Sequence, residues 1–157
     1  MNTPMLNMLL ALVWVALTGT FTPANLLFGF VLGYGLLAIL QRLMAPSRYF
    51  STVPKVVSFT LFFVAELIQA NMRMALTVLS PRLRPRPAVV AIPLDVRSDP
   101  AISLLANLIT LTPGTLHLDV SADRRVMYVH TIHVDDLERF RQEIKSGFER
   151  RVKELLE

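Results

Sequence analysis

Residues 104–130 read LLANLITLTPGTLHLDVSADRRVMYVH, which predicts a helix, a tight turn and a β-hairpin in succession. The apolar first part ends at Thr112-Pro113-Gly114-Thr115, where proline and glycine favour a turn. An alternation of apolar and polar residues follows, so we expect a strand with two different faces: Leu116, Leu118 and Val120 on one, His117 and Asp119 on the other. After a polar tip at residues 122–125, a second strand begins. The pattern indicates a folded domain and specifies no activity.

Composition divides the chain into an apolar half and a charged half. Hydrophobic residues make up 53% of the 157 residues, the mean hydropathy is +0.48, and residues 1–41 contain no Asp, Glu, Lys or Arg. Residues 81–157, in contrast, carry 12 Lys+Arg and 11 Asp+Glu. A membrane half followed by one small water-soluble domain is the simplest interpretation of this division.

The basic pI of about 10.0 does not indicate a nucleic-acid partner, because the charge does not gather into a basic face. The densest cluster directly follows an apolar run, where anionic lipid headgroups are the expected partner: Arg82, Arg84 and Arg86. The chain has no cysteine, which excludes disulfides, thiolate metal sites and cysteine nucleophiles. We expect no cofactor and no bound metal.

Two apolar runs, Met5–Phe21 and Ala24–Leu43, predict a helical hairpin that crosses a membrane. Each is close to the roughly 20 residues that a hydrocarbon core requires. No Lys or Arg precedes the first run and a second follows almost at once, so a retained membrane segment is expected and not a cleavable signal. Gly29 and Gly33 have the spacing that lets two helices approach closely in lipid, although ordinary membrane composition would explain them equally well.

The third apolar run, Val53–Leu79, differs because a polar stripe follows one of its faces. The stripe consists of Lys55, Glu66, Gln69, Arg73, Thr77 and Ser80. Such a helix either crosses the membrane with the stripe toward protein partners, or lies along the interface with the stripe among headgroups. We favour a third membrane-embedded helix, because residues 56–65 are almost uniformly apolar. The number of crossing helices, two or three, stays open at this point.

Glu66 is the only acidic residue among the first 80, so it is the candidate within the membrane half for carrying protons. The competing hypothesis is that its carboxylate pairs with Arg73 or with a partner's lysine and fixes the orientation of the helix. One isolated acid cannot form a relay across a membrane, which favours the pairing. Glu66, Gln69 and Arg73 together form the predicted polar site of this half.

The remaining chain predicts a small α/β domain of order β-α-β-β-α at residues 88–157, after membrane helices at 1–80 and an Arg/Pro linker at 81–87. Ala88–Leu94 has the composition of a buried strand, and Ser98 is the expected capping residue of a helix that occupies 101–110. This helix is too short to cross a bilayer. The last helix presents one apolar stripe, formed by Leu137, Phe140, Ile144, Phe148, Val152 and Leu155.

No catalytic constellation stands out. His130 and His133 are three positions apart, and an odd spacing on a strand directs their rings to opposite faces. Residues 112–115 lack the lysine and the glycine spacing of a phosphate-binding loop, so Gly114 is best explained as a turn residue with positive φ. Asp119 and Asp123 are explained by hydrogen bonds in or beside a hairpin.

The stretch from Leu104 to Thr115, followed by Leu118-Asp119-Val120, resembles the signature of the E-type component of the multisubunit, Mrp-type (Mnh, Pha) Na+/H+ antiporters. The likeness covers nearly the whole chain. His117 departs from it, since a small polar residue is expected there. The resemblance implies a docking or domain-shaping role for the motif residues Asn107, Thr110, Thr112, Pro113, Gly114, Thr115 and Asp119.

The same resemblance implies a non-catalytic subunit in a prokaryotic cell membrane, whose partners are membrane lipids and the other subunits of the antiporter. Ion translocation would then belong mostly to the large subunits, and this chain would support assembly, with the C-terminal domain cytoplasmic. Two alternatives belong to other classes of protein. One is a free-standing, membrane-anchored module that binds a cytosolic ligand, and the other is a membrane enzyme that uses the histidines.

Overall fold

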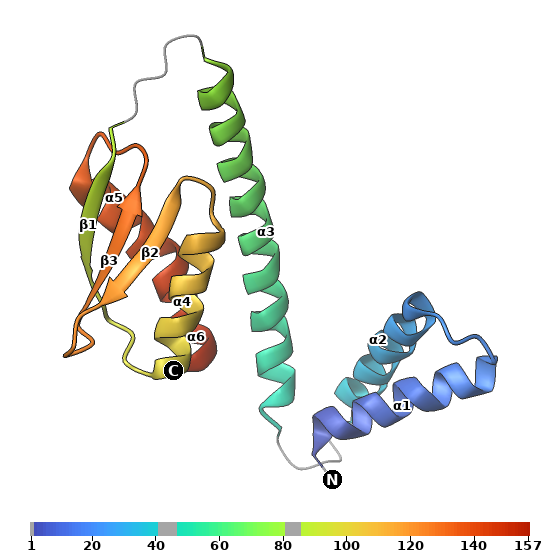
Figure 1. Ribbon diagram of the computed structural model, residues 1–157. Coiled ribbons are helices and arrows are strands. Elements are labelled where there is room, and N and C mark those ends of the chain that lie inside the picture. Colours follow the sequence, from blue (N-terminus) through green and yellow to red (C-terminus); the bar gives the residue numbers. More distant parts are fainter. Residues whose placement is uncertain (1, 41–46, 81–85) are drawn as a thin grey trace. The chain divides into compact units, whose positions relative to one another are not determined.

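A computed structural model describes residues 2–40, 47–80 and 86–157 (Figure 1). The chain divides into two compact units, Met1–Pro54 and Lys55–Glu157. Most of the predicted linker at 81–87, and residues 41–43 of the second predicted helix, lie outside the described residues. The division differs from the boundary expected after residue 80, because most of the third helix packs with the C-terminal domain.

The first unit is built on a helical hairpin, α1 (Thr3–Thr18) and α2 (Pro23–Leu40). Each helix ends or begins where the sequence requires it. Gly19 stops α1 in the left-handed region at φ 66°, and Pro23 occupies the first position of α2, where a missing N–H costs nothing. Asn25 holds the connection together, because its amide donates to the hydroxyl of Thr18 and to both oxygens of Thr20.

The two helices approach through the predicted glycines. A Cβ added to Gly29 would lie 2.9 Å from Cδ1 of Trp14, and one added to Gly33 would collide with the side chain of Asn7. Gly35 faces open space instead. Gly29 and Gly33 therefore have a specific packing role, as the close-approach hypothesis requires.

Helix α3 (Tyr49–Leu79) begins four residues before the predicted apolar run. Its first residues belong to the hairpin unit: Tyr49 accepts a hydrogen bond from Asn7 at 2.6 Å, and Tyr34 contacts the rings of both Tyr49 and Phe50. By length and composition, α2 and α3 could each cross a membrane, whereas α1 has only 16 residues. Apolar length alone therefore does not identify the crossing helices.

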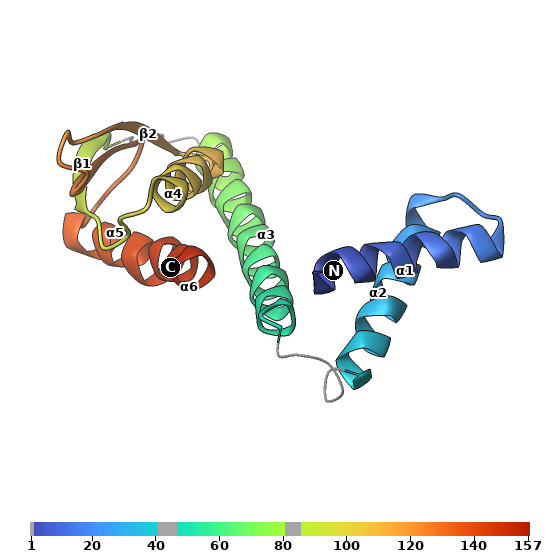
Figure 2. The ribbon, with the colours of Figure 1, turned by 90° about the horizontal axis from the view of Figure 1, so that it is seen from below.

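The second unit contains a three-stranded antiparallel sheet with helices on one face (Figures 1 and 2). Its elements, in chain order after α3, are β1 (Ala88–Pro93), α4 (Asp99–Leu111), β2 (Thr115–Val120), β3 (Val126–Thr131), α5 (Leu137–Ile144), the π-helix η1 (Lys145–Glu149) and α6 (Arg150–Leu156). The strand order is β1-β3-β2, so β1 and β2 run parallel and α4 connects them across β3. The Pro93 that ends β1 lies on an edge strand, where its missing N–H is tolerated.

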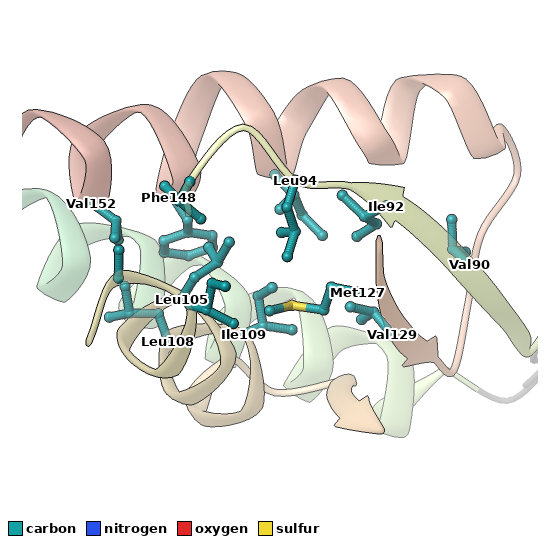
Figure 3. Close-up of a cluster of buried hydrophobic side chains, with 14 residues drawn as sticks. Val90, Ile92, Leu94, Leu105, Leu108, Ile109, Met127, Val129, Phe148 and Val152 are labelled. Atoms are coloured by element: carbon teal, nitrogen blue, oxygen red, sulfur yellow. The ribbon is translucent and has the colours of Figure 1, made fainter. Parts of the chain in front are cut away.

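The core fills the space between this sheet and its helices (Figure 3). Alternate residues of β1 and β3 point inward and meet the apolar stripes of α4 and of the last helical segment. The fully buried members include Ile92, Leu105, Ile109, Met127, Val129 and Val152. The strand and helix periods of the sequence thus converge on one core.

The expected alternation along β2 holds from Leu116 to Leu118 but is wrong for Val120, because a β-bulge interrupts the strand between His117 and Asp119. His117 pairs with Val129 and therefore faces the helices, while Leu116 and Leu118 are exposed. Val120 returns to the core side opposite Met127. One extra residue in the strand separates these apolar positions onto different faces.

The expected side-chain cap on α4 is also wrong. Ser98 occupies the N-cap position with an extended backbone, but its hydroxyl makes no capping hydrogen bond. The side-chain carboxylate of Glu157 instead accepts from the backbone N–H groups of Arg97 at 2.8 Å and Ser98 at 2.9 Å. Glu157 thereby holds the backbone at the entry into α4.

Candidate functional site

The two predicted residue sets meet in an open groove between α3 and the C-terminal domain, where α3 runs beside α4 (Figures 1 and 2). The groove has a volume of about 800 Å³. Glu66 and Arg73 line it from the helix, and residues 112–115 line it from the domain. Residues separated by about 40 positions in sequence therefore form one surface, which sequence analysis treated as two.

The motif Thr112-Pro113-Gly114-Thr115 ends α4 and starts β2 through its own hydrogen bonds. The Thr112 hydroxyl donates to the carbonyl of Leu108 at 2.8 Å, and the Thr115 hydroxyl donates to that of Ile109 at 2.7 Å. Both carbonyls belong to the last turn of α4, where helical N–H donors run out, and the carbonyl of Ile109 also accepts from the N–H of Thr112 at 3.2 Å. Pro113 stops the helix because it has no N–H. The motif therefore ends the helix, and its hydroxyl groups supply hydrogen bonds to the carbonyls at the helix end.

Gly114 is required at the turn for two separate reasons. Its φ is +93°, a backbone conformation that residues other than glycine rarely adopt. In this conformation its carbonyl accepts a hydrogen bond from the N–H of Ile132 at 3.0 Å. An added Cβ would also lie 3.0 Å from Cε of Met74 on α3. The turn therefore forms part of the surface on which α3 packs.

The other predicted motif residues lie outside the groove. Asn107 and Thr110 lie on α4, and the Thr110 hydroxyl accepts from the N–H of His117 at 3.2 Å. Asp119 is exposed at the β-bulge, where its carboxylate accepts from the N–H of Val120 at 2.7 Å. Both hydrogen bonds fix the path of β2 where it leaves α4 and where it bulges.

The polar stripe of α3 is divided. Glu66 and Arg73 form an ion pair at 3.3 Å along the groove, with Glu66 the more covered partner. This ion pair is the one required by the hypothesis that Glu66 fixes the orientation of the helix, which is the alternative to Glu66 carrying protons. Gln69 is exposed and does not line the groove. The carboxylate of Glu66 thus has a local partner two helical turns away.

Phe62 is the anchor of α3 on the domain, a role that sequence analysis missed. Its ring contacts that of Phe148 with centroids 5.7 Å apart, and the guanidinium of Arg151 lies 3.6 Å from its ring centre. Gly147 lies beside the ring, and a Cβ added there would be in ordinary contact with it at 3.8 Å. The sequence does contain a signal for this contact, because Phe59 and Phe62 lie on the same face of the helix as the polar stripe. That position alone does not show which part of the chain the two rings contact.

A buried carboxylate, also missed, holds the last helical segment to the end of β1. Glu149 is 2% exposed and accepts from the backbone N–H of Asp95 at 2.5 Å and from Lys145 at 3.1 Å. The hydrogen bond from Lys145 holds the pKa of Asp95 below its ordinary value. Burial, the largest influence on Lys145, lowers its pKa, but the hydrogen bonds to Asp95 and Glu149 together raise it. Each charged group of this cluster, namely Asp95, Lys145 and Glu149, therefore has an oppositely charged or hydrogen-bonding partner.

The histidines do not come together as a site. His133 is exposed and pairs with Asp135 at 3.2 Å, His130 lies on β3, and His117 faces the helices from β2. Within residues 2–40, 47–80 and 86–157, no three His, Cys, Asp or Glu side chains are placed to hold a metal ion. At the groove, the hydroxyls of Thr112 and Thr115 bind carbonyls at the end of α4, and Glu66 pairs with Arg73.

Comparisons with known proteins agree over nearly the whole length. The family model MNHE, described as Na+/H+ ion antiporter subunit, matches residues 7–155. The E1 component of a Na+/H+ antiporter from Staphylococcus haemolyticus is 39% identical over 150 residues, covering 96% of this chain and 94% of the relative. The E component of a Na+/H+ antiporter from Alkalihalophilus pseudofirmus is 36% identical over 151 residues, covering 96% of each.

Among solved structures, the chain is similar to one from the membrane-bound sulfane sulfur reductase, an archaeal respiratory membrane complex. The TM-score is 0.59 at 23% identity, and 98% of each chain is covered. This likeness supports the fold: a helical N-terminal half and a small antiparallel sheet region.

Proposed function

The chain belongs to the family of Na+/H+ ion antiporter subunits, and from this we propose that it is a non-catalytic subunit of a multisubunit Na+/H+ antiporter. It contributes to the assembly and stability of the complex. Its partners are the other antiporter subunits and the lipids of the cell membrane.

One observation carries the assembly role: the polar residues of the groove have structural partners, while the apolar surface of the helices has none among the described residues. Thr112 and Thr115 satisfy the end of α4, and Glu66 pairs with Arg73. Large apolar side chains of α1, α2 and α3 are exposed, among them Leu17, Phe28, Ile39 and Ile68. A surface of this kind requires lipid or protein to cover it.

We place the α1–α2 hairpin across the membrane and the C-terminal domain on the cytoplasmic side. The hairpin contains no charged residue, and its helices meet through glycines, as is common in lipid. Arg48 and Lys55 follow the second helix closely, which by the positive-inside rule favours a cytoplasmic location. The groove, with Glu66 and the motif turn, then lies on that side as the docking surface of the subunit.

Copurification tests the assembly role. The tagged chain is extracted from its own membrane with a mild detergent, and whatever travels with it is identified by mass spectrometry. We expect the other membrane subunits of the antiporter in fixed ratio. A monodisperse preparation of this chain alone would contradict the proposal and favour the free-standing module that binds a cytosolic ligand.

Cysteine labelling tests the orientation, because the chain has no native cysteine to remove. Phe21→Cys lies in the hairpin connection and Gln142→Cys on exposed α5. With a membrane-impermeant maleimide on intact cells, we expect labelling of Phe21→Cys at once and of Gln142→Cys only after permeabilisation. The opposite pattern would place the domain outside.

A further inference from the structure

We infer that α3 does not cross the bilayer but lies in its surface, with one face on the C-terminal domain and the opposite face on lipid. The inference deepens the proposed function. It rests on that proposal in one respect only, namely that the chain is a membrane protein. It assigns the bilayer itself as the partner of a helix face that no element of the described chain covers. It also decides between two and three crossing helices.

Side chains of α3 contact the domain near the start, in the middle and towards the end of the helix. Near its start, Lys55 donates to the carbonyl of Glu154 at 3.2 Å. Phe62 packs on Phe148 in the middle, and Met74 reaches the turn at Gly114. From residue 55 to residue 74 the helix rises about 28 Å. The domain therefore follows a length of helix close to the roughly 30 Å thickness of a hydrocarbon core.

This face cannot lie inside a hydrocarbon core. Charged side chains line the groove from the helix and from α5, namely Glu66, Arg73, Arg139 and Glu143. Moving such groups and the polar backbone of an attached sheet out of water costs several kcal/mol for each unsatisfied group. A crossing α3 would have to release the domain from most of these contacts, including the packing of the partly buried Phe62 on Phe148.

The opposite face of α3 is apolar over its whole length. It consists of seven residues spaced by three or four, as one side of a helix requires: Val57, Leu61, Val64, Ile68, Met72, Ala75 and Leu79. The six larger ones are between 44% and 79% exposed, and no charged residue interrupts the row. An apolar row opposite a water-facing side is the pattern of an interfacial helix.

Lipid suits this row better than a protein partner does. The row has only aliphatic or thioether side chains, whereas the centres of protein interfaces are enriched in Tyr, Trp and Arg. The start of α3 is also tied to the apolar hairpin, through the contacts of Tyr49 and Phe50 with Tyr34. Aromatic clusters of this kind are typical of the membrane–water boundary. The helix thus starts at the boundary along which its apolar row can lie.

Depth measurement in the intact complex tests the inference. Single cysteines at Val57, Ile68 and Leu79 are labelled with a fluorophore, and the complex is reconstituted in vesicles of phosphatidylcholine and phosphatidylglycerol. Lipids that carry a nitroxide at known depths then quench the fluorescence. We expect all three positions at one shallow depth, about 5–10 Å into the headgroup–acyl boundary. A crossing helix would place the outer two near opposite surfaces, about 33 Å apart along its axis, with Ile68 deepest.

Thr77→Cys is the matched control, because it lies on the same helix but lines the groove. We expect water-soluble quenchers to reach its fluorophore and the lipid nitroxides to leave it unaffected. If the nitroxides quench none of the three row positions, the row is covered by another subunit and the inference is overturned. Assembly of the complex is scored in the same samples, so a failure of the proposed function appears separately as loss of copurification.

Sidedness gives a second readout. Ser51→Cys and Val89→Cys lie on either side of the apolar part of α3, are exposed, and change no charge. We expect an impermeant maleimide to label both from the same side of the membrane. Labelling from opposite sides would show that α3 crosses, and would overturn the inference while leaving the assembly role intact.

Discussion

The hairpin and the C-terminal unit use the same apolar residues in opposite ways. In the hairpin, glycines meet at the helix contact, while Leu17 and Ile39 remain 80% and 76% exposed. In the C-terminal unit, a cluster of aliphatic residues forms a buried core, with Leu105 completely buried, and most charged residues are outside. The difference shows that the two units are folded for different solvents. Helix α3 combines both designs, because one face packs like a soluble helix and the other resembles the hairpin.

The largest effect is expected from a cavity in the soluble core. Leu105→Ala removes a buried side chain and should lower the free energy of unfolding of the C-terminal unit by about 3 kcal/mol. Ile39→Ala, on the exposed surface of α2, is the comparison and should leave that unit unchanged. Thermal unfolding followed by limited proteolysis of the purified complex measures both. Equal effects would contradict the assignment of two different solvents.

In the hairpin, the sensitive positions should be the small ones. Gly33→Val would overlap the side chain of Asn7, whereas Gly35→Val meets nothing within 4 Å. Overpacking of this kind costs about 1–3 kcal/mol. We expect the first variant to reduce the amount of assembled complex several-fold and the second to leave it near wild type, as measured by quantitative copurification. If the two behave alike, the glycines do not determine the helix contact.

At the motif turn, backbone strain can be separated from packing against α3. Gly114→Ala combines a φ of +93° with a close approach to Met74, whereas Gly19→Ala has a φ of +66° and open space. Strain alone costs about 1 kcal/mol in both, and Gly114→Ala should lose more because the terminal methyl group of Met74 on α3 must also shift. Assembly yield and the protease sensitivity of α3 are the measurements. An α3 that stays protected in Gly114→Ala would show that the turn does not support the helix.

The smallest expected effect is a difference between the two units in their stability at acidic pH. The pKa values of Asp95 and Glu157 are held below their ordinary 3.8 and 4.5, by the hydrogen bond from Lys145 and by the N–H groups of Ser98 and Arg97 respectively. A lowered pKa in the folded state gives stability that is present above the ordinary value and lost as the pH falls through the lowered one. The C-terminal unit should therefore lose Tm as the pH falls below about 4.5, and less so in Glu157→Gln.

The hairpin is an internal reference in the same titration, because residues 1–54 contain no acidic side chain. Its helical circular dichroism should persist in detergent while the near-ultraviolet signal of the C-terminal unit declines. Simultaneous loss of both would mean that the two units do not unfold separately.

The sequence predicted the helices and strands better than it predicted which residues they contact. Periodicity and composition located the hairpin, α4 and the apolar stripe of the last helix, because each is a local property of consecutive residues. The packing role of Gly29 and Gly33 was one of two equal hypotheses, since only the opposing residues Asn7 and Trp14 show that the glycines are needed.

What could not be predicted depends on long-range contact. The bulge that turns His117 inward follows from the pairing of β2 with β3, and the cap supplied by Glu157 comes from a residue 59 positions away from Ser98. Glu149 has the spacing of an exposed helical charge, yet it is buried by the loop after β1. The groove itself joins α3 to the motif turn, and no local pattern in either stretch reports the other.

The central claim is that this chain supports the antiporter without carrying ions or protons itself. The most direct measurement is Na+-dependent proton antiport in vesicles, divided by the amount of assembled complex, for Glu66→Gln and Gly33→Val. We predict that Gly33→Val lowers transport only in proportion to the complex lost, and that Glu66→Gln retains the wild-type rate per complex. A fully assembled complex in which Glu66→Gln abolishes antiport would contradict the account, because the Glu66 carboxylate would then take part in transport.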